Sequence, residues 1–208
     1  IEGAAELGLD LTSLQARQLE RYLRELLLWN AAFNLISAKT TPEKAIVHAL
    51  DCLSVIPHVR SRGGPLLDLG SGGGLPAIPL KIVLPDLAVC MVESTRKKTS
   101  FLHQTIRLLD LKGVSVLQER AELVGPEHRG AYSVVISRAT FHLDETDAVY
   151  DLVAAVLENA PAPSRPLAPA PGRPPSAAPR RGPRQVGAGE PLAQRRAGPA
   201  GVLVELLD

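Results

Sequence analysis

Four glycines lie between positions 70 and 74 in the stretch LLDLGSGGGLP, and an acidic residue stands on either side of them. Asp68 comes two residues before the first glycine, and Glu93 follows about 20 residues later, where an acid can reach a ribose. A glycine cluster costs backbone entropy on folding, so it marks a sharp turn or a close approach of the backbone to another molecule. The pattern predicts a corner where backbone N–H groups, flanked by carboxylates, line a ligand.

Two nucleotide cofactors use such a corner, and the neighbouring residues separate them. A dinucleotide places its pyrophosphate at a helix N-terminus, but Pro76 and Pro79 have no N–H to donate, and Asp68 is unfavourable beside that anion. A carboxylate suits the sulfonium and ammonium of S-adenosylmethionine, and Glu93 can accept hydrogen bonds from both ribose hydroxyls. The residues therefore favour S-adenosylmethionine over a nicotinamide dinucleotide. A plain strand–turn–helix corner with a solvated Glu93 is the remaining alternative.

Short apolar runs alternate with helical stretches around this corner. An amphipathic helix is predicted within residues 12–36 by the spacing of its apolar residues, which are Leu19, Tyr22, Leu23, Leu26 and Leu27. Thr41 and Pro42 predict a second helix that stops before Pro57. The runs PLLDLG, LAVCMVE, VSVLQE and YSVVIS predict four strands, and residues 76–84 and 95–109 predict two helices between them. Continuous apolar strands that alternate with helices indicate an α/β fold with a doubly wound parallel sheet.

The chain divides by composition into three segments. We expect a helical segment over residues 1–60, a parallel-sheet core over 61–160 and an atypical tail over 161–208. Residues 161–201 hold eleven of the eighteen prolines and seven arginines, with no lysine and no aromatic residue. Such a segment cannot bury enough apolar surface to offset its ordering entropy. It is either a disordered tail that contacts RNA phosphates or not the native ending of the domain, as after a shift of reading frame in GC-rich DNA.

The bulk properties exclude several classes of protein. The 208 residues carry a formal net charge of +1, so nucleic-acid contact requires a local patch. Cys52 and Cys90 fit neither a disulfide framework nor a metal site, so we expect two small buried core side chains and no metal. No stretch is long and apolar enough to span a membrane, so we expect no membrane partner and a cytoplasmic location.

Six stretches together resemble one family in order and spacing. They are LLLWNAAFNLIS, VHALDCL, LLDLGSGGGLPAIPLKIV, MVESTRKKTSFL, ERAEL and YSVVISRA. They are similar to the bacterial 16S ribosomal RNA guanine-N7 methyltransferases, the RsmG or glucose-inhibited division protein B family, over about residues 9–158. The GLPxIPL extension of the glycine loop and the WNxxxNL segment are specific to that family.

The resemblance implies a class I, Rossmann-like methyltransferase domain after an N-terminal helical segment. It implies S-adenosylmethionine as donor and N7 of a guanine in 16S rRNA of the small ribosomal subunit as acceptor. Gly70 and Leu75 would line the cofactor, Ala121 and Glu122 would flank its adenine, and Arg138 would lie beside its reacting end. With the residues of the corner, the expected cofactor-binding set is Asp68, Gly70, Gly72, Gly74, Leu75, Glu93, Ala121, Glu122 and Arg138.

Further candidates come from helical spacing and local charge. His48 and Asp51 share one helix face, either as a surface pair or as a rim that positions the substrate base with Arg138. Arg96, Lys97 and Lys98 open a helix, where the macrodipole disfavours cations, so we expect either RNA phosphate contacts or a solvated basic turn. Asn34 is a helix C-terminal residue or an RNA contact. Trp29 is expected in the core.

The C-terminal part departs from the family. The resemblance implies a fifth strand and a final β-hairpin, and a Lys-Gly segment near the reacting end, but only residues 201–207 could form a terminal strand here. We therefore expect missing or altered C-terminal strands and an unpaired edge beside the fourth strand. Two alternative functions stay open: a methyltransferase for another RNA or a small molecule, and a non-catalytic cofactor- or RNA-binding remnant.

Overall fold

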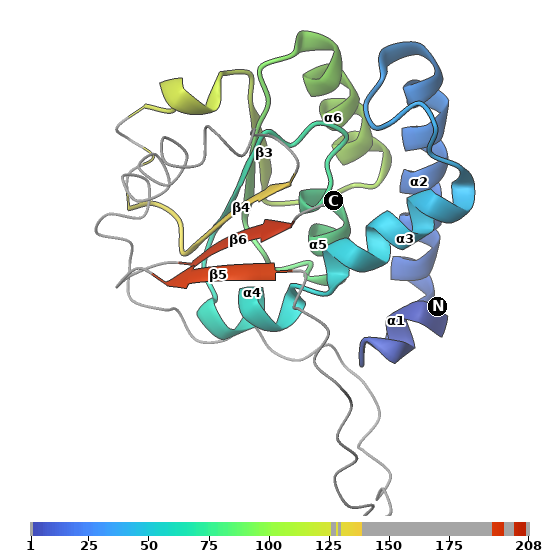
Figure 1. Ribbon diagram of the computed structural model, residues 1–208, viewed down its shortest axis with the longest axis horizontal. Helices are drawn as coiled ribbons and strands as arrows, with labels where there is room; N and C mark the ends of the chain where they lie inside the picture. The colour runs from blue at the N-terminus through green and yellow to red at the C-terminus, as the bar shows by residue number, and fades with distance from the viewer. Residues whose placement is uncertain (1, 126–127, 129, 139–192, 198–201, 207–208) are drawn as a thin grey trace, which may run out of the picture.

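The structure is a computed structural model, and it describes residues 2–125, 128, 130–138, 193–197 and 202–206 (Figure 1). Four helices precede the first strand: α1 (Glu2–Glu6), α2 (Ser13–Phe33), α3 (Pro42–Leu53) and α4 (Ile56–Arg62). The sheet then alternates with helices in the order β1 (Leu66–Leu69), α5 (Ala77–Val83), β2 (Val89–Val92), α6 (Arg96–Leu108), β3 (Val114–Leu117), the 3₁₀ turn η1 (Ala121–Leu123) and β4 (Val134–Arg138). Two further strands are β5 (Ala193–Ala197) and β6 (Val202–Leu206).

Helix α2 begins and ends where its sequence predicts. The hydroxyl of Thr12 accepts the N–H of Gln15, and the Gln15 side chain accepts the N–H of Thr12, so two donors at the helix start are satisfied reciprocally. The helix ends at Asn34, which adopts the left-handed conformation with φ 50° and donates its N–H to the carbonyl of Asn30. The predicted helix within residues 12–36 is confirmed, and Asn34 is its C-cap.

The second predicted helix is confirmed, and it stops before Pro57 as expected. Thr41 caps α3, and Pro42 occupies its first turn. Pro57 lies in the first turn of a further helix, α4, which was not predicted from the sequence. A proline is tolerated there because the N–H that it lacks would have no partner within the helix.

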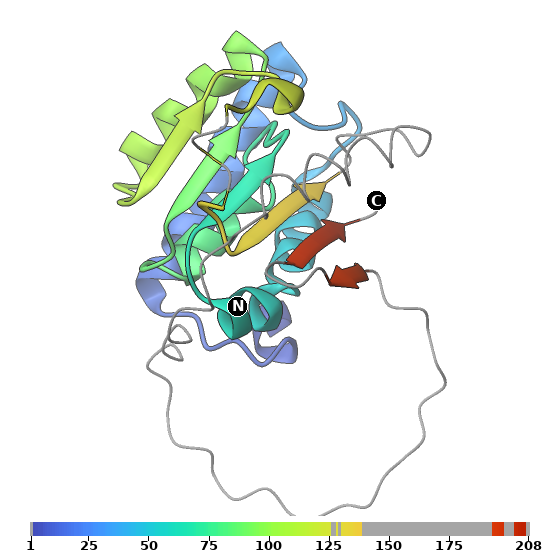
Figure 2. The same cartoon turned by 90° about the vertical axis from the view of Figure 1, so that its left-hand side faces the viewer.

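The sheet has the strand order β3-β2-β1-β4-β6-β5 (Figure 2). The four predicted strands, β1 to β4, are all present and pair in parallel. From β1 the chain first adds β2 and β3 on one side, and it then crosses to the other side of β1 to add β4. The strand order therefore reverses at β1. Ligands bind at such a switch point, beyond the carboxyl ends of the strands. The doubly wound α/β fold is therefore confirmed.

The two faces of the sheet carry different clusters of the core. Asp68 and the alternate residues of the strands share a face with α2, α3, α5 and α6, where the larger core cluster includes Tyr22, Leu26 and Phe101. The second cluster lies on the opposite face and includes Leu67, Leu69, Cys90, Val92, Ala121, Tyr132 and Val135. The larger cluster thus joins described residues of the expected helical segment with described residues of the sheet, from Ala4 to Ile136.

Helix α2 also holds the carboxyl ends of two other helices. The amide of Gln15 donates to the carbonyls of Ile82 and Val83 at the end of α5, at 3.2 Å each. The amide of Gln18 donates to the carbonyl of Leu109 after α6 at 3.0 Å. The last carbonyls of a helix lack partners within the helix, so these side chains of α2 supply the missing donors and tie α2 to the ends of α5 and α6.

The C-terminal strands correct one expectation. β6 lies within the segment 201–207 that was predicted as a terminal strand, and it pairs in parallel with β4, with Val134 beside Val202. The expected unpaired edge of β4 is therefore wrong, because β6 supplies the missing hydrogen bonds. β5 was not predicted, and it pairs antiparallel with β6. The remaining predictions for the tail, at 161–192 and 198–201, lie outside the described residues.

Candidate cofactor and substrate site

The glycine loop lies at the switch point of the sheet. It connects β1 to α5, and the N–H groups of Gly70 and Ser71 both donate to the carbonyl of Val92 on β2, at 2.9 and 3.0 Å. The hydroxyl of Tyr22 on α2 donates to the carbonyl of Gly73 at 2.8 Å. The loop is thus held from the strand side and from the helix side.

Packing within the chain disfavours a side chain at two of the glycines. A Cβ on Gly74 would lie 2.4 Å from Cδ1 of Ile78, and this residue has φ +85°. A Cβ on Gly73 would lie 2.7 Å from Cδ1 of Leu26. Close contact with α2 and α5 therefore explains these two positions. Cofactor contacts at Gly70, Gly72 and Gly74 stay predictions.

Glu93 joins the end of β2 to the glycine loop. Its side chain is buried, and Oε2 accepts the N–H of Gly72 at 2.9 Å, while Oε1 accepts the N–H of Thr95 at 2.8 Å. A carboxylate has about four lone-pair positions, so each oxygen can accept one further hydrogen bond. Glu93 therefore has the capacity for two ribose hydroxyls while it holds the loop.

Asp68 is a fully buried carboxyl group beneath the same loop. Neither side-chain oxygen accepts a hydrogen bond of ordinary geometry within the part of the chain that the structure describes. Burial raises its pKa from 3.8 to about 7, against smaller lowering effects of the nearby Ser71 hydroxyl and Ala77 N–H. A buried carboxylate without a partner is costly, and a cation nearby would relieve that cost.

The donors around the loop fit a cationic cofactor better than a pyrophosphate. The N–H of Ile78, in the first turn of α5, is already bonded to the carbonyl of Gly74 at 2.8 Å, and Pro79 has none. The nearby N–H of Ala77 faces the buried Asp68. Few donors are left for an anion, whereas two buried carboxylates lie within the corner. The residues present therefore fit S-adenosylmethionine.

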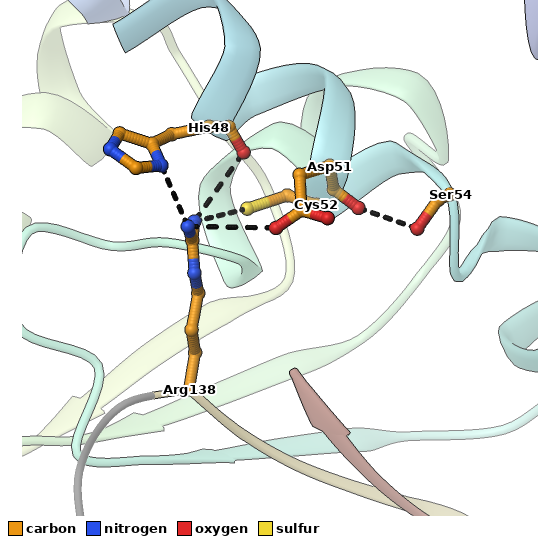
Figure 3. Close-up of polar contacts among 5 residues, drawn as sticks. All are labelled: His48, Asp51, Cys52, Ser54 and Arg138. Atoms are coloured by element: carbon orange, nitrogen blue, oxygen red, sulfur yellow. Dashed lines mark hydrogen bonds and ion pairs between the residues drawn. The ribbon is translucent and has the colours of Figure 1, made fainter. Parts of the chain in front are cut away.

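A second polar cluster lies where β4 ends, and it joins that strand to α3 (Figure 3). The guanidinium of Arg138 donates to Nδ1 of His48 at 2.8 Å, to the carbonyl of His48 at 3.4 Å and to Sγ of Cys52 at 3.3 Å. It also lies 3.5 Å from Oδ2 of Asp51. The Arg138 side chain is 7% exposed and that of Asp51 is 24% exposed, so this charge pair is largely withdrawn from water. The structure thus brings together the three predicted positioning residues.

Cys52 is held in its thiol form within this cluster. Its burial raises its pKa to about 12, although the adjacent Arg138 acts in the opposite direction. A thiol with that pKa carries almost no thiolate near neutral pH, so Cys52 is not a nucleophile. Cys52 and Cys90 are both buried and free, as the sequence predicts.

The remaining predicted residues lie around the same edge of the sheet. Ala121 and Glu122 form part of η1, directly after β3, and Ala121 is buried. Leu75 is 9% exposed and belongs to the larger core cluster. Arg96, Lys97 and Lys98 form the first turn of α6. Their cofactor and RNA contacts stay predictions.

Two residues of the site were missed from the sequence. Tyr22 was assigned only to an apolar helix stripe, and Cys52 only to the core, yet Tyr22 bonds the glycine loop and Cys52 contacts Arg138. The phenol in an otherwise apolar stripe was the available signal, because a buried tyrosine hydroxyl needs a partner. Trp29 packs partly buried against the core cluster, as predicted.

Neither a cluster of metal ligands nor a membrane-spanning helix is present among the described residues. Within the described ranges, no three or more His, Cys, Asp and Glu side chains lie close enough to hold a metal ion. Among the helices that the structure describes, none has the length and apolar character needed to cross a membrane.

Comparison with known proteins agrees with the resemblance seen in the sequence. The model of the GidB family, described as rRNA small subunit methyltransferase G, matches residues 15–155. The chain belongs to this family. Ribosomal RNA small subunit methyltransferase G of Geobacter sp. (strain M21) is 44% identical over 138 residues, which are 66% of this chain and 63% of that relative. The protein of the same name from Chromobacterium violaceum is 41% identical over 144 residues, 69% of this chain and 68% of that relative.

The match with this family does not extend over whole relatives. The chain spans less than two thirds of the Geobacter relative, and 61% of a relative from Psychrobacter sp. (strain PRwf-1) that is 37% identical. The family match ends at residue 155, before the segment with the atypical composition.

Among solved structures, magnesium protoporphyrin IX methyltransferase from Synechocystis PCC 6803 is 15% identical, with a TM-score of 0.48 over 66% of this chain and 72% of that one.

Proposed function

We propose that the protein transfers a methyl group from S-adenosylmethionine to N7 of a guanine in the 16S rRNA of the small ribosomal subunit. The feature that supports the donor is the pair of acids at the corner: Asp68, whose buried oxygens accept no hydrogen bond of ordinary geometry from the described residues, and Glu93, which has free acceptor capacity across the loop. Membership in the rRNA small subunit methyltransferase G family supports the acceptor. A cytoplasmic location follows from that proposal, since the acceptor is ribosomal RNA.

S-adenosylmethionine, when bound, supplies an electrophilic methyl group on a sulfonium. In the proposed site Glu93 accepts the ribose hydroxyls, and Asp68 offers its negative charge to the cationic end. Ala121 and Glu122 flank the adenine, and Gly70, Gly72, Gly74 and Leu75 border the cofactor. In this proposal eight of the nine predicted cofactor residues bind the donor. The ninth, Arg138, acts at the reacting end.

Guanine N7 needs no general base. It has an in-plane lone pair and no proton, so it could form a bond to the donor's methyl group without losing a proton. The electrons of the broken C–S bond would stay with the donor, and the guanine would take the positive charge. Catalysis is then mainly proximity and in-line orientation within a suitable electrostatic environment. Arg138, held by His48 and Asp51, positions the reacting groups in this proposal.

RNA must present an unpaired guanine, because duplex bases are shielded. We assign phosphate contacts to Arg96, Lys97 and Lys98, all in the first turn of α6. Asn34 is the C-cap of α2, and in this proposal its side chain also contacts the RNA.

Calorimetry with S-adenosylmethionine, followed by methyl transfer onto undermodified small ribosomal subunits, tests the proposal. We expect binding, and label at N7 of a guanine. Binding without transfer would instead select the non-catalytic alternative, and transfer to free small molecules would select another enzyme class. Label on an exocyclic or ring-carbon position would overturn the mechanism.

A matched pair of variants tests the corner. In the wild-type residue, the two carboxylate oxygens of Glu93 accept the N–H groups of Gly72 and Thr95. Glu93→Gln replaces one of these oxygens with an NH₂ group that cannot accept, so we expect cofactor affinity to fall by about tenfold or more. Glu20→Gln neutralises an exposed acid on α2, with 60% of its side chain exposed, and should leave affinity unchanged. Equal affinity in the two variants would contradict the ribose role of Glu93.

A further inference from the structure

The end of α2 and the start of α6 meet at an exposed aromatic residue. The two helices run antiparallel, since Gln18 bonds the carboxyl end of α6 while Lys97, at its other end, lies over the ring of Phe33. The ammonium of Lys97 is 5.4 Å from the centre of that ring. Figure 1 shows α2 and α6 next to each other on one side of the sheet.

Phe33 is held in place but is not buried. Trp29 packs against it with ring centres 5.4 Å apart, and Trp29 in turn packs against the fully buried Phe101 at 5.5 Å. Phe33 itself remains 38% exposed. The ring is thus fixed from beneath by a core residue and presents part of its surface to solvent.

The charged residues in the first turn of α6 are all cations. Arg96, Lys97 and Lys98 follow one another in the first turn of α6, which contains no acidic residue. Arg96 and Lys97 are exposed, and within the described part of the chain none of the three forms an ion pair. The helix macrodipole disfavours cations at this position, so their presence is not explained by the stability of α6.

The same surface borders the cofactor corner. Arg96 comes three residues after Glu93, whose carboxylate holds Gly72. On the other side, the carbonyl of Leu35, two residues after Phe33, lies 3.7 Å from where a Cβ on Gly72 would be. A polymer that delivers a base to the corner would therefore pass close to Phe33 and the three cations.

We propose that Phe33, Arg96, Lys97 and Lys98 form a docking surface for single-stranded RNA next to the target guanine. This inference rests on the proposed function, because it assigns the acceptor RNA to one face of the molecule. A neighbouring base stacks on the exposed part of Phe33, and the cations contact the phosphates on either side of that base. An aromatic face combined with cations, without acids, is the chemistry by which proteins bind single-stranded nucleic acid.

Binding of the full-length protein to a single-stranded oligoribonucleotide that contains 2-aminopurine tests this surface. Phe33→Ala should weaken binding by about 5- to 150-fold and reduce the fluorescence change of the stacked base, with the salt dependence unchanged. Phe33→Tyr should retain both. The logarithm of the RNA association constant falls linearly with the logarithm of the salt concentration. Lys97→Gln should make this slope less steep by about 0.7, the value for one phosphate contact on a single strand.

Two control variants remove comparable groups elsewhere. Lys112→Gln neutralises a side chain that is 80% exposed and lies just before β3, at the opposite edge of the sheet. Leu28→Ala truncates a residue on α2 that is 67% exposed. Both should bind the oligoribonucleotide as the unmodified protein does.

Methyl transfer onto undermodified small subunits separates the possible failures. If the unmodified protein transfers methyl groups but Phe33→Ala and Lys97→Gln bind RNA normally, the docking surface is wrong while the proposed function stands. If these variants lose transfer onto assembled subunits yet bind RNA normally, the surface contacts protein and the RNA assignment is overturned. If the unmodified protein binds RNA through Phe33 but binds no S-adenosylmethionine, the proposed function fails independently.

Discussion

The guanidinium of Arg138, at the end of β4, donates to Nδ1 of His48 on α3 at 2.8 Å, although 90 residues of chain separate them. A guanidinium can only donate, so Nδ1 is the accepting nitrogen and the ring proton lies on Nε2. Asp51 lies 3.5 Å from the same guanidinium and offsets its charge. Helix α3 therefore fixes where a mostly buried cation sits beside the glycine loop.

Replacing His48 with phenylalanine should destabilise the protein and slow methyl transfer. The variant removes one acceptor from a guanidinium that is 7% exposed, so we expect the free energy of unfolding to fall by about 1–3 kcal/mol. Under the proposed function, kcat should fall more than KM rises, because Arg138 loses its position while the cofactor corner is intact. Urea unfolding and steady-state kinetics measure both.

Val47→Ala is the matched control for His48→Phe, because Val47 is the neighbouring residue on α3 and is 63% exposed. It should leave stability and kinetics unchanged. If His48→Phe were as stable and as active as this control, the interaction between His48 and Arg138 would have no positioning role.

Replacing Tyr22 with phenylalanine should loosen the glycine loop. The hydroxyl donates to the carbonyl of Gly73 at 2.8 Å in a fully buried setting, so its loss leaves a buried carbonyl without that partner. We expect unfolding to require about 1–3 kcal/mol less free energy, with an unchanged slope against urea. An unchanged midpoint would show that the hydrogen bond does not contribute.

Asp68 should make stability depend on pH. Because burial raises its folded-state pKa from 3.8 to about 7, the folded chain binds this proton more tightly than the unfolded chain. The stabilising contribution is therefore complete below about pH 4 and is lost as the pH rises to about 7. Between about pH 4 and about pH 7, the unfolding free energy of the unmodified protein should fall relative to that of Asp68→Asn. Parallel pH profiles of the two proteins would contradict the shifted pKa.

Cofactor affinity should show the opposite dependence on pH. A bound cation favours the carboxylate form of Asp68, so binding below its pKa must release a proton. If bound S-adenosylmethionine keeps Asp68 ionised, affinity should rise by roughly tenfold between about pH 6 and about pH 8. Calorimetry in two buffers of different ionisation enthalpy measures the released proton. Asp68→Asn should show neither the pH dependence of affinity nor the release of a proton. If the unmodified protein also showed neither, the proposed role of Asp68 in cofactor binding would be wrong.

Several features of the protein were predictable from the sequence because they depend on neighbouring residues. The strands β1 to β4 follow from short apolar runs with turn residues at their ends, and Thr12 and Thr41 cap their helices through contacts three residues away. The glycine loop and Glu93 were also identified, because parallel strands bring their carboxyl ends to one edge of the sheet.

The tertiary structure alone decided which distant residues complete the site. Tyr22 reaches Gly73 across 51 residues, and Arg138 reaches Cys52 across 86, so neither pair leaves a trace in local spacing. The same holds for β6, which pairs with β4 beyond the family match, since any extended segment can supply a strand's hydrogen bonds. Local pattern fixes how a segment folds, whereas the partners of its side chains depend on how the helices pack against the sheet.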